Sequence, residues 1–299
     1  MLSYEANTHA KKIKNAMQEH TQKLKKTVKL IIGFVAAILF LTLLAITMSS
    51  TDITTTVIIS AIILLGGYST LIIIYLLITK TYVSVKITYE VLTPLLVQQY
   101  NYDEGTQITH YADNPNIYKR IMNETGLFTR GGWFKRFEEC QGMCGDYSFS
   151  IIRGQYFIST GNTTTNVFNG NIIKIDGVSK DLMQIRNKSK PYVKGVKFDK
   201  YTQHDLLIYI EAGKELPDNI NSLSVFTKDF LDKTNSKNVV LATINNALYF
   251  AYDGPAILKK IKTIDQDIVI ERYKHFKSEL SLVEPLIQLV QKNESPDNY

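Results

Sequence analysis

The stretch "NVVLATINNALYFAYDG", from Asn238 to Gly254, predicts the architecture of the larger part of the chain. It contains two runs rich in β-branched and aromatic residues, which favour the pleated backbone of a strand. The runs meet at Asn245-Asn246, and asparagine tolerates the positive φ that a tight hairpin turn requires. The stretch therefore predicts an antiparallel β-hairpin.

Further strand-like segments precede this hairpin. They are "DYSFSIIRGQYFIST" (146–160), with a turn expected at Arg153-Gly154, "TNVFNGNIIKID" (165–176), "YVKGVKFDKY" (192–201) and "HDLLIYIEAG" (204–213). Helical patterns cover residues 114–126, residues 222–235 with Phe226 and Phe230 on one face, and residues 266–291. Because strands mostly follow strands and helices flank them, the sequence predicts an α+β fold with a mainly antiparallel sheet.

Two long apolar runs stand closer to the amino terminus. "LIIGFVAAILFLTLLAITM" covers residues 30–48, "VIISAIILLGGYSTLIIIYLLI" covers residues 57–78, and neither contains a charge. At 1.5 Å per residue they are roughly 28 and 33 Å long, close to the about 30 Å of a bilayer's hydrocarbon core. A soluble helix of this length would show a polar face. The sequence therefore predicts a transmembrane hairpin over residues 30–78, with residues 49–56 as its outer loop.

The positive charges predict the orientation of this hairpin. Residues 1–29 hold seven lysines against Glu5 and Glu19, whereas the outer loop has no basic residue. Lysine and arginine favour the cytoplasmic side of a membrane, so we expect an inner-membrane protein with both termini in the cytoplasm. The expected domains are a basic amphipathic N-terminal helix (1–29), the hairpin (30–78), a helical stalk (79–99) that Pro94 kinks or ends, and a cytoplasmic α+β domain (100–299).

Small residues inside the hairpin suggest how its helices pack. Gly33 and Ala37 lie four residues apart in the first run, and Gly66 and Thr70 do so in the second. Such spacing allows a close approach of helix backbones, although glycine and alanine are also common in spans without this role. Both runs lack ionisable residues, which transport and proton relay usually leave in the membrane. The sequence therefore predicts that the hairpin serves as a membrane anchor.

Two stretches combine basic and aromatic residues. "LFTRGGWFKRFEECQGMCG" (127–145) predicts a long loop that either lies on the inner leaflet or packs its rings onto the domain. "RNKSKPYVKGVKFDK" (186–200) would bind an acidic partner or anionic lipid, or form the solvated face of a hairpin. The candidate membrane or partner contacts are Trp133, Phe134, Lys135, Arg136, Phe137, Arg186, Lys188, Lys190, Lys194 and Lys197.

The sequence holds no motif that names a reaction. It lacks a phosphate-binding loop, a dinucleotide-binding glycine pattern, a zinc-protease motif and a serine-hydrolase elbow, so we expect no cofactor. Cys140 and Cys144 have no second Cys or His pair at ligand spacing, so they predict ordinary thiols and no metal site. His204 and Asp205 would be strand neighbours on opposite faces, which makes a poor catalytic pair. The nearly balanced charge of residues 79–299 argues against nucleic-acid binding.

These features together resemble a family of bacterial two-helix membrane proteins, domain of unknown function 3137. The resemblance rests on the hairpin, "YEVLTPLLVQQYNY" (89–102), "GLF" (126–128), "GDYSFSI" (145–151), "YVKGVKFDKY" and "NALYFAYDG" before a closing helix. It covers most of residues 30–292 and carries no catalytic residue. Members are often encoded beside LemA-family helical membrane proteins, so the resemblance implies a LemA-family partner.

The sequence as a whole predicts a non-catalytic, membrane-anchored cytoplasmic binding or scaffold protein. Its expected partners are membrane lipid, a second copy of the chain or a LemA-family protein. The alternative is an enzyme acting on lipid or a small substrate at the inner leaflet, and a pocket converging on His110, His204 or an acidic pair would favour it. A minimal transporter subunit is a third reading, but only serine and threonine would supply its polar span faces.

Overall fold

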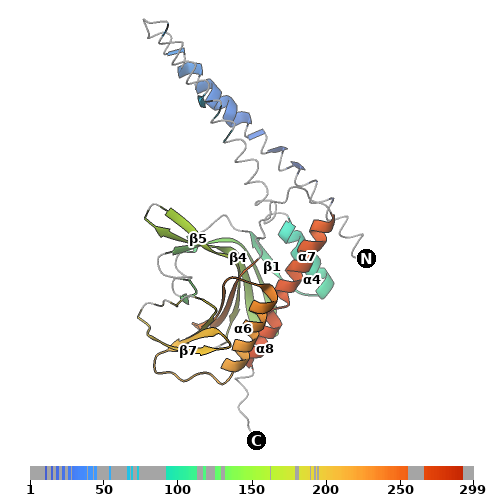
Figure 1. The fold of residues 1–299 in the computed structure, drawn as a ribbon. Helices are drawn as coiled ribbons and strands as arrows, with labels where there is room; N and C mark the ends of the chain where they lie inside the picture. The colour runs from blue at the N-terminus through green and yellow to red at the C-terminus, as the bar shows by residue number, and fades with distance from the viewer. Residues whose placement is uncertain are drawn as a thin grey trace. The chain divides into compact units, whose positions relative to one another are not determined.

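The chain forms two compact units in the computed structural model, Met1–Leu92 with Lys260–Ile270, and Thr93–Lys259 with Glu271–Tyr299. The residues that the structure describes are scattered positions between 11 and 73, then 92–112, 117–118, 125–128, 132–161, 163–178, 182–188, 190–191, 193, 195–254 and 266–291. Figure 1 gives the order of the elements along the chain.

In the first unit, residues 29–38 are helical and carry exposed apolar side chains, among them Leu30 at 76% and Phe34 at 68% exposure. Within the described positions, no helix combines the length and the apolar character needed to cross a membrane. Most of the predicted hairpin and residues 79–91 of the predicted stalk lie outside the described residues. A Cβ added at Gly33 or Gly66 meets no described atom within 4 Å, and Thr70 is not described, so helix packing there stays a prediction.

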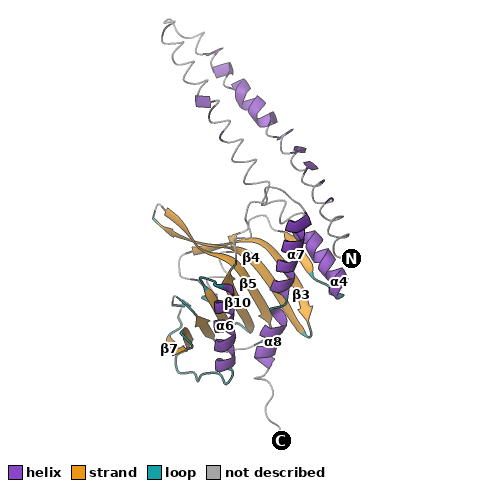
Figure 2. Cartoon of the chain, turned by 45° about the vertical axis from the view of Figure 1, so that its right-hand side comes forward, coloured by secondary structure: helices purple, strands orange, loops and turns teal. Residues whose placement is uncertain are grey.

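The second unit is built on one ten-stranded antiparallel sheet, which confirms the predicted α+β class (Figure 2). Its strand order is β1 (Thr109–Ala112), β3 (Gly132–Cys144), β4 (Tyr147–Thr160), β5 (Thr163–Asp176), β10 (Ala247–Asp253), β9 (Val239–Ile244), β6 (Met183–Arg186), β8 (Leu206–Glu211) and β7 (Phe198–Gln203). The short strand β2 (Ile117–Tyr118) pairs with β3, where a helix was predicted.

The central hairpin of the sheet has the predicted geometry. β9 and β10 pair from Ala247 opposite Ile244, and the turn residues Asn245 and Asn246 have φ values of 53° and 60°. The Asn246 carbonyl also accepts the amide of Gly177, at 2.8 Å. The turn therefore fixes both the hairpin and the end of the neighbouring strand β5.

Two predictions about the first long strands are wrong. Residues 132–144 form strand β3 where a loop was predicted, and β4 runs through Arg153-Gly154 without a turn. At both positions a glycine lets an aromatic ring pack closely against the backbone. A Cβ at Gly154 would lie 2.4 Å from the Phe134 ring, and one at Gly132 would lie 2.4 Å from the Tyr156 ring. The glycines that suggested loops thus make room for buried aromatic rings.

Helices α6 (Ile220–Thr234), α7 (Gln266–Leu280) and α8 (Val283–Gln291) lie along one face of the sheet (Figures 1 and 2). Phe226 and Phe230 contact Phe250 edge-on, with ring centroids 5.5 and 4.9 Å apart, which confirms their predicted face. The single closing helix predicted over 266–291 is two helices, because Pro285 lacks an amide proton and is tolerated only in a first turn.

Helix α4 (Thr93–Glu104) packs along α7 and holds Pro94 in its first turn, where proline is tolerated. The predicted kink or end of the stalk at Pro94 stays a prediction, because residues 79–91 lie outside the described residues. It extends beyond residue 99, the predicted end of the stalk. Tyr100 meets Phe276 edge-on at 5.8 Å, and Tyr273 donates a hydrogen bond to Asp103.

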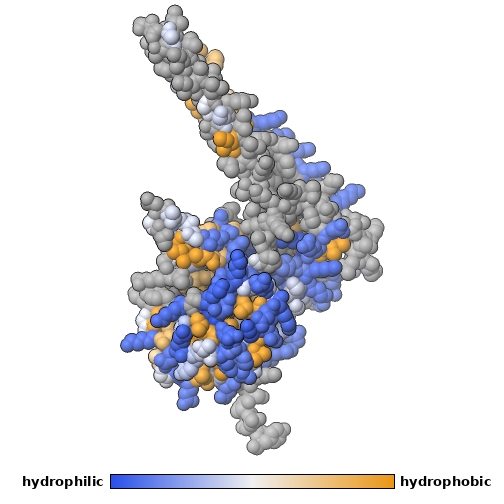
Figure 3. Space-filling model, in the orientation of Figure 1, coloured by the Kyte–Doolittle hydropathy of each residue, from blue (hydrophilic) through white to orange (hydrophobic). Residues whose placement is uncertain are grey.

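The opposite face of the sheet carries an apolar cluster, which includes Phe134, Tyr156 and Phe168. Phe128 covers it, with its ring stacked 4.5 Å from that of Tyr156. The described surface of the second unit in Figure 3 is mostly hydrophilic, with hydrophobic patches between the polar side chains.

Candidate functional site

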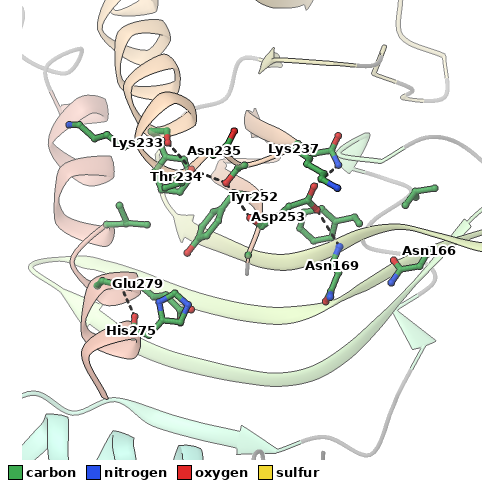
Figure 4. A pocket seen from close by; sticks show the side chains of 18 residues that line it. Asn166, Asn169, Lys233, Thr234, Asn235, Lys237, Tyr252, Asp253, His275 and Glu279 are labelled. Carbon is green, nitrogen blue, oxygen red and sulfur yellow. Dashed lines mark hydrogen bonds between the residues drawn. The ribbon is translucent and has the colours of Figure 1, made fainter. Parts of the chain in front are cut away.

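A cleft of about 790 Å³ opens in the second unit where β10 ends beside β5. Its walls are the Asn166–Asn169 segment of β5, the end of β10, residues 233–238 at the end of α6 and beyond it, and α7 (Figure 4). Ligand sites in proteins usually measure about 300–1,000 Å³, so the cleft is large enough for a small molecule or a short segment of chain.

The cleft exists because two paired strands have different lengths. β10 ends at Asp253, opposite Gly170, whereas β5 continues outward to Thr163. Among the described residues, β5 beyond Gly170 therefore has β4 on one side and no strand on the other, from Asn169 to Asn166. A Cβ at Gly170 would lie 2.0 Å from the Tyr252 carbonyl oxygen, so only glycine lets β10 end this close to β5.

Asp253 closes the inner end of the cleft. Its Oδ1 accepts the backbone amide of Asn169 at 3.3 Å, and its Oδ2 accepts the side-chain amide of Asn238 at 2.5 Å. Burial raises the pKa of Asp253, although these hydrogen bonds and nearby Lys237 act in the opposite direction. The carboxylate thus takes the position of the backbone acceptor that a longer β10 would offer to β5.

His275 contributes an unsatisfied polar atom. Its Nε2 is buried and has no hydrogen-bond partner among the described residues. In Figure 4 the imidazole is directed from α7 toward the strands. A buried polar atom without a partner costs roughly 1–3 kcal/mol, so its presence in a cleft indicates a place for a ligand group.

Two lysines stand at the rim near the end of α6. Lys233 and Lys237 are exposed, and neither forms an ion pair with any described residue. Asn235, which ends α6 in a left-handed conformation, lies between them. This rim therefore presents two lysines, of which Lys237 lies near the Asp253 carboxylate, next to a largely apolar hollow that contains Phe230 and Leu282.

A buried ionic network lies beneath the cleft. The Arg153 guanidinium pairs with Glu138 of β3 and Glu279 of α7, and its Nε donates to Asn171 at 3.1 Å. Asn171 in turn donates to Glu279 at 2.9 Å and to the Tyr252 hydroxyl at 3.1 Å. Glu279 and Tyr252 also line the cleft, so the network connects the site to the sheet.

Electrostatics in this network stabilise charged carboxylates. Burial would raise the pKa of Glu138, but the Arg153 guanidinium and the hydrogen bond with His110 outweigh it, and the pKa is lowered. The same surroundings act differently on a phenol, since burial and the charge of Glu279 raise the pKa of Tyr252.

The histidines predicted as possible pocket residues do not line the cleft. His110 lies against Glu138, with 3.2 Å between Nε2 and the carboxylate oxygen. His204 and Asp205 are not strand neighbours as predicted but form the β7–β8 turn, with φ values of 50° and 60°. His204 contacts Asn221 at 3.2 Å.

The predicted aromatic contact residues of β3 divide between surface and core. Trp133 is half-buried and stacks on Phe157 with centroids 5.8 Å apart, and Lys135 lies 5.6 Å from the Phe137 ring centroid. Phe134 is fully buried in the apolar cluster, which corrects its prediction as a surface contact. Its place follows from strand alternation, because Phe134 faces opposite to Trp133 and Lys135. Arg136 pairs with Glu139.

The prediction for Arg186 also needs correction. It is 1% exposed and donates to the Gln184 side chain at 2.8 Å and to the Gly126 and Leu127 carbonyls at 2.5 and 2.7 Å. Burial lowers its pKa to about 10. Arg186 thus holds the chain around Leu127 against β6. Lys188, Lys190 and Lys197 are exposed, and Lys194 lies outside the described residues.

The residues of the cleft and the network were missed by sequence reasoning. The two partners of Arg153 lie 15 and 126 residues away along the chain, so no local pattern connects them. A usable signal is the single arginine, Arg153, inside the apolar alternation of residues 146–160, at a position where the sequence predicts a turn.

Cys140 is buried, Cys144 is half-buried, and both are free thiols. Burial raises the pKa of each.

Comparison with protein-family models, with curated proteins and with solved structures gives no match for this chain.

Proposed function

We propose that the chain is a membrane-attached binding protein that holds its ligand in the cleft between β5, β10, α7 and the end of α6. The observation that carries the binding role is His275, which lines a hollow of about 790 Å³ and whose buried Nε2 has no hydrogen-bond partner among the described residues. Binding sites characteristically combine an apolar hollow with a few convergent polar groups, and this cleft has both.

Membrane attachment is supported by the two apolar runs at 30–48 and 57–78 and by the exposed apolar side chains on residues 29–38. Full burial of one large apolar side chain is worth about 1.5–3 kcal/mol, so a helix that exposes several is costly in water and stable against lipid. We propose that this hairpin anchors the chain in the inner membrane with both termini in the cytoplasm. A second copy or a LemA-family protein remains the proposed partner.

An enzyme at the inner leaflet is the second candidate. Asp253, whose pKa is raised by burial, lies in the same cleft as His275, and perturbed carboxylates occur among general acids. Both oxygens of Asp253 nevertheless accept hydrogen bonds from Asn169 and Asn238, which favours a structural role for it and a binding role for the cleft.

The test compares full-length protein purified from membranes in mild detergent with two tryptophan variants, one in α7 and one in the turn that follows it. Ser278 lines the cleft and is exposed, so Ser278→Trp should fill it with little disturbance of the core. Ser281 is also exposed but does not line the cleft, so Ser281→Trp is the matched control. We expect mass spectrometry to find a ligand with the wild type and the control that is absent from Ser278→Trp. A ligand retained equally by all three would place binding elsewhere.

A further inference from the structure

We propose that the cleft accepts an extended, acidic peptide segment that adds as a strand to the edge of β5 at Asn166–Asn169, which pairs with no described strand on the side of β10. This inference rests on the proposed binding function and names the class of its ligand. The partner would extend the line of β10 from the point where β10 stops.

The lining of the cleft shows that it runs along a strand edge. Successive side chains of a strand point to opposite faces, yet four consecutive residues of β5, Asn166 to Asn169, line this hollow. Phe168 belongs to the apolar cluster on one face of the sheet, whereas Tyr252 contacts Phe230 of α6 on the other. The cleft therefore spans the thickness of the sheet, and its wall is the backbone edge of β5 over about 13 Å.

The backbone of this edge is prepared for a strand partner. The Asn169 amide points into the cleft and donates to Asp253 Oδ1 at 3.3 Å, a longer contact than the usual 2.9–3.0 Å of an amide hydrogen bond. A peptide carbonyl can replace this acceptor. The pairing register between β4 and β5 shifts at this edge, because Tyr156 pairs with Phe168 but the next residue, Phe157, pairs with Asn166. Val167 is left as an extra residue of β5, and 40% of its surface is exposed. Bulges of this kind are common beside binding sites.

The side-chain surroundings indicate which peptides fit. One side chain of an added strand would meet Phe230 and Leu282, which favours an apolar residue there. Side chains two positions away share that face and would lie near Lys233 and Lys237, which form no ion pair with described residues and favour a carboxylate. Strand addition in general takes its affinity from main-chain hydrogen bonds and its specificity from pockets for alternate side chains. His275, whose buried Nε2 has no hydrogen-bond partner among the described residues, also lines the cleft.

The experiment uses the full chain in lipid nanodiscs and a displayed library of random peptides of about nine residues, long enough for one strand. Selection against the wild type is followed by subtraction on Ser278→Trp. We expect peptides with an apolar residue and an acidic residue two positions from it, so that both face the end of α6. Synthetic copies should bind at least about tenfold more weakly to Lys233→Glu/Lys237→Glu, and unchanged to Lys197→Glu/Lys200→Glu, whose exposed lysines lie on or beside β7.

Backbone N-methylation separates strand addition from side-chain docking. A selected peptide methylated at every second nitrogen keeps its side chains but loses main-chain donors, so its affinity should fall at least about tenfold. Hydrogen exchange of fragments covering residues 166–169 should slow when the unmethylated peptide binds. Equal affinity of the methylated peptide would overturn the proposal, and so would a library that yields no peptide sensitive to Ser278→Trp. If such a library fails while purified wild type still carries a ligand that Ser278→Trp lacks, strand addition is wrong and the binding function holds. If both fail, both are wrong.

Discussion

At the scale of single residues, Arg153 connects three elements of the second unit. One guanidinium pairs with both Glu138 on β3 and Glu279 on α7 and also donates to Asn171 on β5. Both carboxylates are 2% exposed, so neither can turn to water if its partner is removed. The arrangement makes the stability of the sheet and the position of α7 depend on the same side chain.

We predict that Arg153→Met lowers the free energy of unfolding by about 3–5 kcal/mol, because it leaves two buried carboxylates without their cation. Urea unfolding of the full chain, followed by the fluorescence of the only tryptophan, Trp133 on β3, measures this change. The exposed Lys214 has no ion pair with described residues, so Lys214→Met should stay within about 0.5 kcal/mol of wild type. A similar small effect for Arg153→Met would contradict the network.

The lowered pKa of Glu138 predicts a specific response to acid. Because its folded-state pKa lies below the usual value of 4.5, the charged form stabilises the fold above that value. This contribution is lost as the pH falls through the folded-state pKa. Glu138→Gln should therefore be less stable at neutral pH and should lose less stability between neutral pH and acid than wild type does. Thermal unfolding at a series of pH values tests this, with exposed Glu215→Gln as the control that should keep the wild-type slope.

At the scale of elements, the length difference between β5 and β10 decides the site. The two strands pair from Ala247 opposite Asp176 to Asp253 opposite Gly170, and the cleft begins at the next residue. The close approach of the two backbones at this last pair places the Asp253 carboxylate against Asn169. Changes at Gly170 should therefore affect stability and binding together.

Gly170→Ala should reduce the free energy of unfolding by about 1–3 kcal/mol, since the added Cβ would lie 2.0 Å from the Tyr252 carbonyl oxygen and force β10 outward. Hydrogen exchange should become faster over residues 250–253 and remain unchanged over the Asn245-Asn246 turn. Thr165→Ala, in the exposed outer half of β5, provides the comparison and should change neither quantity. If alanine is tolerated at 170 without faster exchange, the close approach is not rigid.

At the scale of the whole molecule, structural features that depend on residues close together in the sequence could be predicted, and features that depend on residues far apart could not. The Asn245-Asn246 turn and the Phe226–Phe230 face were readable because each depends on residues a few positions apart. Gly132 and Gly154 suggested loops because the rings that need their space, Tyr156 and Phe134, are brought in by strand pairing. The cleft could not be predicted, because it depends on where β10 stops relative to β5. That end point is set by packing between strands joined by 70 residues of intervening chain.

The proposed membrane topology makes the last prediction, and it concerns the chain as a whole. In the proposed topology, seven lysines before the first apolar run and none in residues 49–56 predict that this loop lies outside and the second unit in the cytoplasm. Cys140 is buried, and replacing Cys144 with serine leaves little native thiol to react with a reagent in solution. In that background a membrane-impermeant maleimide should label Thr54→Cys in intact spheroplasts. Lys200→Cys, on the exposed strand β7, should react only after the membrane is permeabilised. Labelling of Lys200→Cys in intact spheroplasts would show that the orientation is inverted. Recovery of the wild type in the supernatant after an alkaline wash would exclude the membrane anchor, because only a chain held by apolar contact with lipid resists that wash.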